Sequence, residues 1–216
     1  MSWISIAHTV RKNPRRAYQV CRDLFTHLGP VIQFLEERRQ GSHFSLSEGS
    51  LTVEELRFLK DLVDETAGTS GPLIEIGTLL GATSSRMAMW KRAEQRIVTV
   101  DNYSWGRWGL TPETQFELVA LVLRYWIEAG DAVQIRANKD EWFAAYDGPE
   151  PTLVFCDAVH TYQATAADIA WARRIGARQI AGHDYAAEHP GVVQAVVEAG
   201  GPDRLVGSLW TLPAAV

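Results

Sequence analysis

The sequence has no long apolar run and few cysteines, and both absences restrict its class. A helix that crosses a bilayer needs roughly 18 or more mostly apolar residues, so we expect no membrane contact. The first residues, Met1-Ser-Trp-Ile, do not join a charged start to an apolar stretch, as a signal peptide does. Cys21 and Cys156 have neither metal-site nor redox-motif spacing. We therefore expect reduced thiols in a cytoplasmic protein.

The chain also lacks an excess of positive charge. The formal net charge is −5, and the sequence pI is about 5.7. Proteins that bind nucleic acids mainly through phosphate contacts carry basic patches and have a high pI. The composition therefore predicts that no nucleic acid is a partner of this protein.

Short apolar segments alternate with amphipathic segments from residue 73 onward. We predict strands at residues 73–76, 97–100, 133–135, 153–156, 179–181 and 205–212, and helices at residues 83–94, 112–130, 139–146, 164–175 and 191–199. This alternation indicates a doubly wound α/β fold, with a mostly parallel sheet and helices on both faces. Leu153-Val-Phe-Cys156 has no polar alternation, as expected for a strand that is covered on both sides.

The remaining N-terminal segment is predicted to be helical. Residues 1–50 form an N-terminal helical extension, which would serve as a lid or as a contact between two copies in a homodimer. Thr52-Val-Glu-Glu55 is a capping box that begins a helix through about Thr66. Residues 51–216 are long enough for one α/β domain with a sizeable core.

A glycine loop follows the first predicted strand, with the sequence Glu75-Ile-Gly77-Thr78-Leu-Leu-Gly81-Ala-Thr83. Doubly wound sheets bind ligands at the carboxyl ends of their strands, where glycine lets the backbone approach a ligand closely. The loop is neither the G-x-G-x-x-G pattern of dinucleotide sites nor a P-loop. By itself it fits a plain strand–helix turn equally well.

An acidic residue ends the second predicted strand. Asp101 lies 20 residues after Gly81, where a carboxylate can accept both ribose hydroxyls of a nucleoside cofactor. A helix cap or a surface aspartate is the alternative. The loop and Asp101, followed by Asn102, together favour a nucleoside cofactor.

Two further segments allow more than one interpretation. Tyr103, Trp105 and Trp108 would stack on a cofactor, wall a substrate pocket or pack over the edge of the sheet. Asn138 or Asp140, after the third strand, would receive the adenine amino group or cap the next helix.

The fourth and fifth predicted strands end in Asp157-Ala-Val-His160-Thr-Tyr162 and His183-Asp184-Tyr185. If these strands are neighbours, their ends lie about 5 Å apart, and Asp157 and Asp184 converge. Two carboxylates in one cleft share a proton or a cation, and an oxygen-rich set suits Mg²⁺. His183 would be a third ligand, favouring a transition metal, or would support the site. Helix-capping acids and a structural His160 are the alternatives.

These motifs together resemble the small class I S-adenosylmethionine (SAM)-dependent methyltransferases related to macrocin-type and cephalosporin-hydroxylase-type enzymes. The resemblance covers about residues 50–212, and the D-x-x-H-x-Y and H-D-Y motifs are its most specific part. It implies a seven-stranded sheet, SAM as the methyl donor and O-methylation assisted by Mg²⁺ or another divalent metal. Relatives have two acids in the final motif, whereas this chain has His183-Asp184.

The resemblance also implies roles for individual residues. Glu75, Gly77 and Gly81 would cradle the methionine part of SAM, and Asp101 would hold its ribose. Asp157 and Asp184 would ligate the metal, and His160 would be the general base. The predicted cofactor-binding set is Glu75, Gly77, Thr78, Gly81, Thr83, Asp101, Asn102, Asn138 and Asp157; the metal set is Asp157, His183 and Asp184; the catalytic set is His160 and Asp157.

The sequence thus predicts methyl transfer to a hydroxyl of a small-molecule acceptor, such as a sugar or a phenol. A nicotinamide-dependent oxidoreductase is the first rival, and the absence of G-x-G-x-x-G after the first strand argues against it. A non-catalytic interaction protein that keeps the fold is the second rival. The joint presence of Asp157, His160 and Asp184 argues against that rival.

Overall fold

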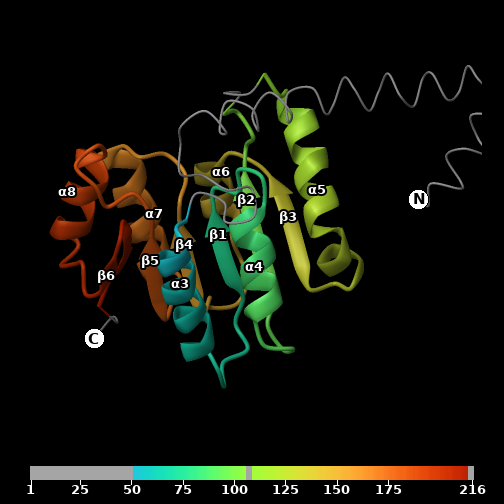
Figure 1. Cartoon of the computed structure of the whole chain (residues 1–216), viewed down its shortest axis with the longest axis horizontal. Helices are drawn as coiled ribbons and strands as arrows, with labels where there is room; N and C mark the ends of the chain where they lie inside the picture. Colours follow the sequence, from blue (N-terminus) through green and yellow to red (C-terminus); the bar gives the residue numbers. More distant parts are fainter. Residues whose placement is uncertain (1–50, 106–108, 214–216) are drawn as a thin grey trace, which may run out of the picture.

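A computed structural model describes residues 51–105 and 109–213 of the chain. The described residues form one seven-stranded sheet with helices on both faces (Figure 1). The predicted extension at residues 1–50, as well as Cys21 and Trp108, lies outside the described residues.

The sheet has the strand order β3-β2-β1-β4-β5-β7-β6. Its strands are β1 Leu73–Ile76, β2 Ile97–Asp101, β3 Ala132–Arg136, β4 Leu153–Cys156, β5 Gln179–Gly182, β6 Leu205–Val206 and β7 Leu209–Thr211. Strands β1 to β5 are parallel, and β7 runs antiparallel to both β5 and β6. The predicted doubly wound, mostly parallel seven-stranded sheet is confirmed.

The helices are α3 Val53–Glu65, α4 Ala82–Trp90, α5 Pro112–Glu128, α6 Lys139–Ala145, α7 Tyr162–Arg174 and α8 Pro190–Glu198. Side-chain caps mark the first residues of several of these helices. The Thr52 side chain accepts from the Glu55 N–H while the Glu55 side chain accepts from the Thr52 N–H, which confirms the predicted capping box. Thr111 caps α5, and Pro112 occupies its first turn, also as predicted.

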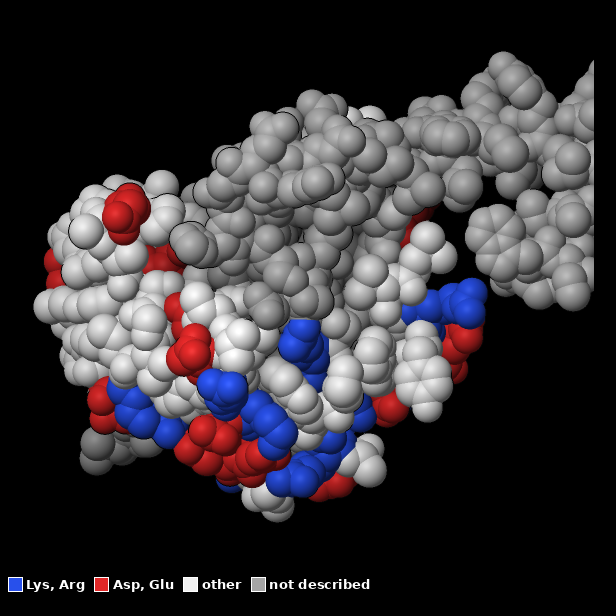
Figure 2. Space-filling view, viewed as in Figure 1, with Lys and Arg blue, Asp and Glu red and all other residues white. Residues whose placement is uncertain are grey.

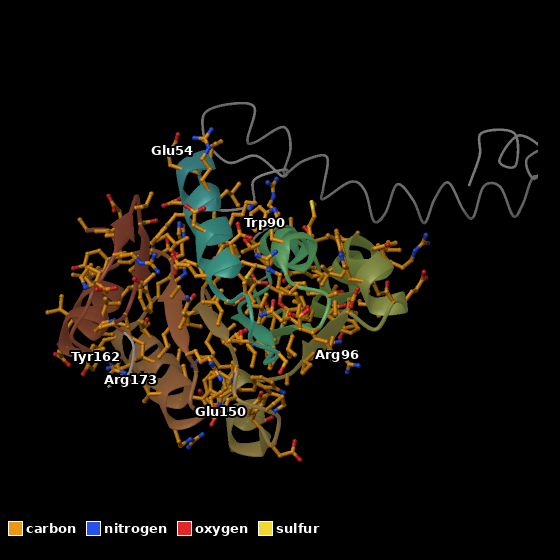
Figure 3. All side chains as sticks on the ribbon, turned by 90° about the horizontal axis from the view of Figure 1, so that it is seen from below. Glu54, Trp90, Arg96, Glu150, Tyr162 and Arg173 are labelled. Atoms are coloured by element: carbon orange, nitrogen blue, oxygen red, sulfur yellow. The ribbon has the colours of Figure 1, made fainter. Side chains whose placement is uncertain are left out.

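Two apolar cores lie on opposite faces of the sheet. One joins α3 and α4 to the sheet through residues such as Leu59, Leu62 and Met87. The other joins α6, α7 and α8 to the sheet. In it the ring of Phe143 stacks on that of Trp171, with the ring centroids 4.1 Å apart. Figure 3 shows α3 and α4 on one side of the sheet and α7 on the other. Coverage of both faces explains why β1 and β4 are buried along their whole length.

Two predicted boundaries are wrong. Residues 205–212, predicted as one strand, form the β6–β7 hairpin, because Gly207 adopts a φ of 60° and reverses the chain. The helix predicted at residues 83–94 ends at Trp90, because Lys91 turns to an extended conformation with ψ 159°.

Charged side chains on the α3 face are paired with one another. Lys60 and Arg92 both contact Asp64, and Arg204 of the hairpin contacts Glu65 at the end of α3. Figure 2 shows basic and acidic side chains intermixed over the lower part of this face. The Glu65–Arg204 pair therefore ties the hairpin to α3. Among the described residues, no helix combines the length and apolar character needed to cross a membrane.

Candidate functional site

The candidate site lies at the carboxyl edge of the parallel strands, where β1 and β4 are neighbours and the strand order reverses. Hydrogen bonds continue the sheet by one residue at this edge. The Gly77 N–H donates to Val100, and the Asp157 N–H donates to Ile76. The His183 N–H donates to Cys156 in the same way. The ends of β1, β4 and β5 are therefore held side by side, as the sequence predicted for β4 and β5.

Residues with unfavourable backbone conformations lie at the same edge of the sheet. The described non-glycine residues with positive φ are Leu79, Tyr103 and Asp184, at 53°, 56° and 60°. They follow β1, β2 and β5, respectively. Unfavourable backbone conformations of this kind concentrate at ligand sites, where the surrounding structure holds them.

Gly77 is required by the packing between two loops. Its φ is 95°, and a Cβ atom there would lie 2.0 Å from the Asp157 carbonyl oxygen. Gly81 adopts a φ of 78° and precedes α4, where a Cβ would meet Val119 at 3.3 Å. The glycines thus shape the loop itself, in addition to any space that they leave for a ligand.

Glu75 supports this loop from inside the protein. It is buried, and its carboxylate accepts hydrogen bonds from Ser84 of α4 and from Thr99 of β2. Burial raises the pKa of Glu75 well above its usual value, although Ser84 opposes the shift. Thr78 and Thr83 are buried in the same region. Contact of Glu75, Gly77 and Gly81 with the methionine part of SAM stays a prediction, as does cofactor binding by Thr78 and Thr83.

Asp101 joins two loops. Its Oδ2 accepts from the N–H groups of Thr78 at 2.8 Å and Leu79 at 3.0 Å, and its Oδ1 accepts from the Tyr103 N–H at 2.7 Å. The exposed Asn102 accepts from the Ser104 N–H. Asp101 therefore holds the glycine loop in place, a role that the sequence did not predict. Its contact with a ribose stays a prediction.

The structure bears on the two segments that the sequence left open, the loop after β2 and the residues after β3. Tyr103 is fully buried and packs edge-on against Phe116, so packing is the interpretation that holds for this residue. Trp105 in the same loop is 52% exposed. Asn138 caps α6 by accepting from the Asp140 N–H at 2.8 Å. The capping alternative is therefore correct for Asn138, and its contact with adenine stays a prediction.

Asp184 is the centre of the polar cluster. Its Oδ2 lies 2.8 Å from His160 Nε2, and its Oδ1 lies 3.4 Å from His183 Nδ1 and 3.6 Å from His189 Nε2. Asp157 Oδ1 lies 3.9 Å from His160 and 4.0 Å from His183. The structure thus brings together all the predicted metal and catalytic residues and adds His189.

The charges in this cluster offset one another. Burial opposes ionisation of Asp184, but the close contact with His160 and the positive charge of His160 and His183 hold its pKa well below the usual range. The hydrogen bond to Asp184 in turn raises the pKa of His160. Burial lowers the pKa of His183, but Asp184, Glu55 and Asp157 outweigh burial and raise it to about 10. The cluster is therefore built to hold positive charge beside its carboxylates.

The donor set fits a divalent cation. One ligand atom each from Asp157, His183 and Asp184 lies within 4.8 Å of the others. His183 is 7% exposed, and its Nδ1 makes no hydrogen bond. A buried imidazole nitrogen that makes no hydrogen bond is unusual, since buried polar atoms are nearly always hydrogen-bonded. Two carboxylates and this nitrogen are suitable ligands for a dication.

Three residues near this cluster were missed from the sequence. Glu55 was assigned only to the capping box, yet its Oε1 accepts from Ser208, which also contacts His183. His189 directly precedes α8 and lies in no motif that the sequence analysis recognised. The sequence carries no signal for Ser208, because its contact depends on the β6–β7 turn.

Comparison with known proteins places the fold in a class. Neither a protein-family model nor a curated protein matches the sequence. Among solved structures, the calicheamicin methyltransferase CalS11 has a TM-score of 0.59 and 16% identity, covering 83% of this chain and 90% of that one. The chain therefore shares the fold of this methyltransferase.

Two further structures have the same fold. The O-methyltransferase TomG from Streptomyces achromogenes, in complex with SAM, has a TM-score of 0.53 and 19% identity, covering 69% of this chain and 67% of TomG. An O-methyltransferase from Bacillus cereus, in complex with SAH, has a TM-score of 0.53 and 18% identity, covering 80% of this chain and 76% of that one.

Proposed function

We propose that this protein transfers a methyl group from SAM to a hydroxyl of a small-molecule acceptor, with assistance from a divalent cation. One observation carries the proposal. The glycine loop after β1 packs against Asp157 at the point where the strand order reverses, and Asp157 and Asp184 both lie close to His160. A nucleoside cofactor and a polar cluster suited to a dication would then share one edge of the sheet.

The donor would lie on the loops after β1, β2 and β3. Gly77 and Gly81 would flank the methionine part, with Glu75 beneath them. Asp101 and Asn102 would face the ribose, and Asn138 would face the adenine. Support comes from the shared fold and from TomG and the Bacillus cereus enzyme, which are in complex with SAM and SAH.

The acceptor would bind beside the polar cluster. Asp157, His183 and Asp184 would hold the cation, which when bound lowers the pKa of a hydroxyl and fixes its position. His160 is 37% exposed, and its Nε2 is engaged with Asp184. Its Nδ1 then remains to accept the hydroxyl proton. Alignment of donor and acceptor would supply most of the acceleration.

Titration calorimetry with SAM, with and without Mg²⁺, tests this proposal, followed by a screen of hydroxyl acceptors. Asp157→Ala should still bind SAM but lose divalent-dependent turnover. The exposed Asp147→Ala is the matched control and should behave as wild type. Normal methylation by Asp157→Ala contradicts metal assistance, and a chain that does not bind SAM contradicts the whole proposal.

A further inference from the structure

His183 has two chemically different sides. Its Nε2 lies 2.8 Å from Ser208 Oγ and 3.4 Å from Glu55 Oε1. Its Nδ1 faces Asp157 and Asp184 and makes no hydrogen bond. The ring thus sits between a supporting pair on one side and the carboxylate cluster on the other.

The supporting pair fixes where the ring proton lies. Glu55 Oε1 accepts from the Ser208 N–H at 2.7 Å and from the Ser208 hydroxyl at 3.0 Å. Because that hydroxyl proton is given to Glu55, Ser208 Oγ can only accept from His183. The proton of a neutral ring is therefore on Nε2, and the Nδ1 lone pair points to Asp157 and Asp184.

This arrangement is typical of metal-binding histidines. Such a histidine usually donates its second ring N–H to a neighbouring acceptor, which fixes the tautomer and orients the ring. Here the acceptor is a hydroxyl that is itself held by a carboxylate. Glu55 is in turn fixed by the Thr52 N–H, which donates to Oε2 at 2.7 Å.

We propose that His183 Nδ1 is a ligand of a first-row transition-metal dication, bound together with Asp157 and Asp184 and positioned by the Ser208–Glu55 pair. The inference rests on the proposed function only for the role of this cation in methyl transfer. Imidazole nitrogen favours ions such as Mn²⁺, Co²⁺ or Zn²⁺, whereas Mg²⁺ prefers an all-oxygen shell.

Two other arrangements of these residues compete with the proposed metal site. His160 and His189 form a second group with Asp184, and their rings lie 4.5 Å apart. Both are about one third exposed, and His160 Nε2 is already engaged with Asp184. His183 is the better ligand because its free nitrogen is buried and its other nitrogen is held. The other competing arrangement involves no metal: a protonated His183 would pair with Asp157 and Asp184 and exclude a cation.

Calorimetry and electron spin-echo spectroscopy on the full chain, stripped of metal, distinguish these arrangements. The Mn²⁺-loaded wild type should show nitrogen coupling from a bound imidazole. His183→Asn should lose this coupling, and its preference for Co²⁺ over Mg²⁺ should fall about tenfold or more. His189→Asn is the matched control and should keep both properties. The inference is overturned by absence of coupling in wild type, or by its loss in His189→Asn but not in His183→Asn.

Ser208→Ala tests the supporting pair independently and also serves if His183→Asn fails to fold. It should weaken Co²⁺ binding by about 10–100-fold, the usual effect of removing such a neighbour of a ligand. Ser85→Ala removes a hydroxyl that bonds only within α4, to Ala82, and should leave the affinity unchanged. Equal affinities in the two variants would contradict a role for Ser208.

The outcomes separate this inference from the proposed function. A chain that binds SAM without any nitrogen coupling overturns the inference and leaves methyl transfer standing. A chain that shows nitrogen coupling but does not bind SAM keeps the metal site and overturns the proposed function.

Discussion

Single residues at the carboxyl edge of the sheet are constrained by one another before any ligand is present. Gly77 shows this most directly, because its missing side chain lets the β1 loop touch the backbone of Asp157. The glycine loop after β1 and the loop that begins at Asp157 therefore share one contact. A shift of the backbone on either side of this contact should affect both loops.

Gly77→Ala should be strongly destabilising. A non-glycine residue in the left-handed region costs about 1–2 kcal/mol, and the clash with Asp157 adds roughly 1–3 kcal/mol. Gly68→Ala is the matched control, since Gly68 has a φ of 84° but nothing within 4 Å of an added Cβ. Denaturant unfolding of the wild type, Gly77→Ala and Gly68→Ala measures the backbone cost and the cost of the clash. Equal losses in the two variants would show that the loop contact does not matter.

Asp101→Asn should weaken both the fold and SAM binding. The carboxylate accepts three backbone N–H bonds, and an amide would turn an NH₂ group toward some of them. A hydrogen bond to a charged group contributes about 1.5–3 kcal/mol, so unfolding should become easier by about that amount. Asp147→Asn, on the exposed surface, provides the baseline. Unchanged stability would contradict a structural role for Asp101.

At the level of elements, sequence patterns predicted most of the fold. The central strands β1 and β4 are short, fully buried runs, and helix starts such as Thr52 and Thr111 carry their own capping chemistry. The β6–β7 hairpin was missed because the positive φ of Gly207 reverses the chain within residues 205–212, which have the sequence pattern of one continuous strand.

The candidate site could be predicted only in part. Asp157, His160 and Asp184 follow directly from strand ends, because parallel strands bring those ends together. Glu55 and Ser208 reach His183 through contacts between distant segments, which no local pattern encodes. For the same reason the sequence could not show that Asp101 holds the glycine loop.

The pair between Glu65 of α3 and Arg204 of the hairpin should make a small, pH-dependent contribution. Its two N–O distances are 2.7 and 2.8 Å, but both side chains are over 40% exposed, so we expect less than about 1 kcal/mol. The Arg204 hydrogen bond lowers the pKa of Glu65. A lowered acid pKa stabilises the fold at neutral pH, and this contribution disappears as pH falls through the folded-state value.

Glu65→Gln tests this contribution. Its free energy of unfolding should lie slightly below that of wild type at pH 7, and the two should converge in acid. A difference that grows as pH falls would contradict the assignment. Gln163→Ala, at an exposed position on α7, is a control that should show no such convergence.

At the level of the whole molecule, ligand binding should be visible as a change in stability. SAM at about 100 times its dissociation constant should raise the free energy of unfolding by about 2.7 kcal/mol. NAD at the same concentration should have no effect, because the loop after β1 is not a dinucleotide pattern. Thermal unfolding of the full chain measures both. Stabilisation by NAD instead of SAM would favour an oxidoreductase.

The bond between Glu55 and Ser208 has a consequence for how the protein is made. Its partners are 153 residues apart, so it closes one of the longest loops in the described chain. Long loops are entropically costly to close, and a growing chain folds from its N-terminus first. Helix α3 and its cap can therefore form early, whereas the Ser208 contact to His183 can form only after the 153 residues that follow Glu55 have been synthesised. A nascent chain would have its glycine loop long before it could orient His183.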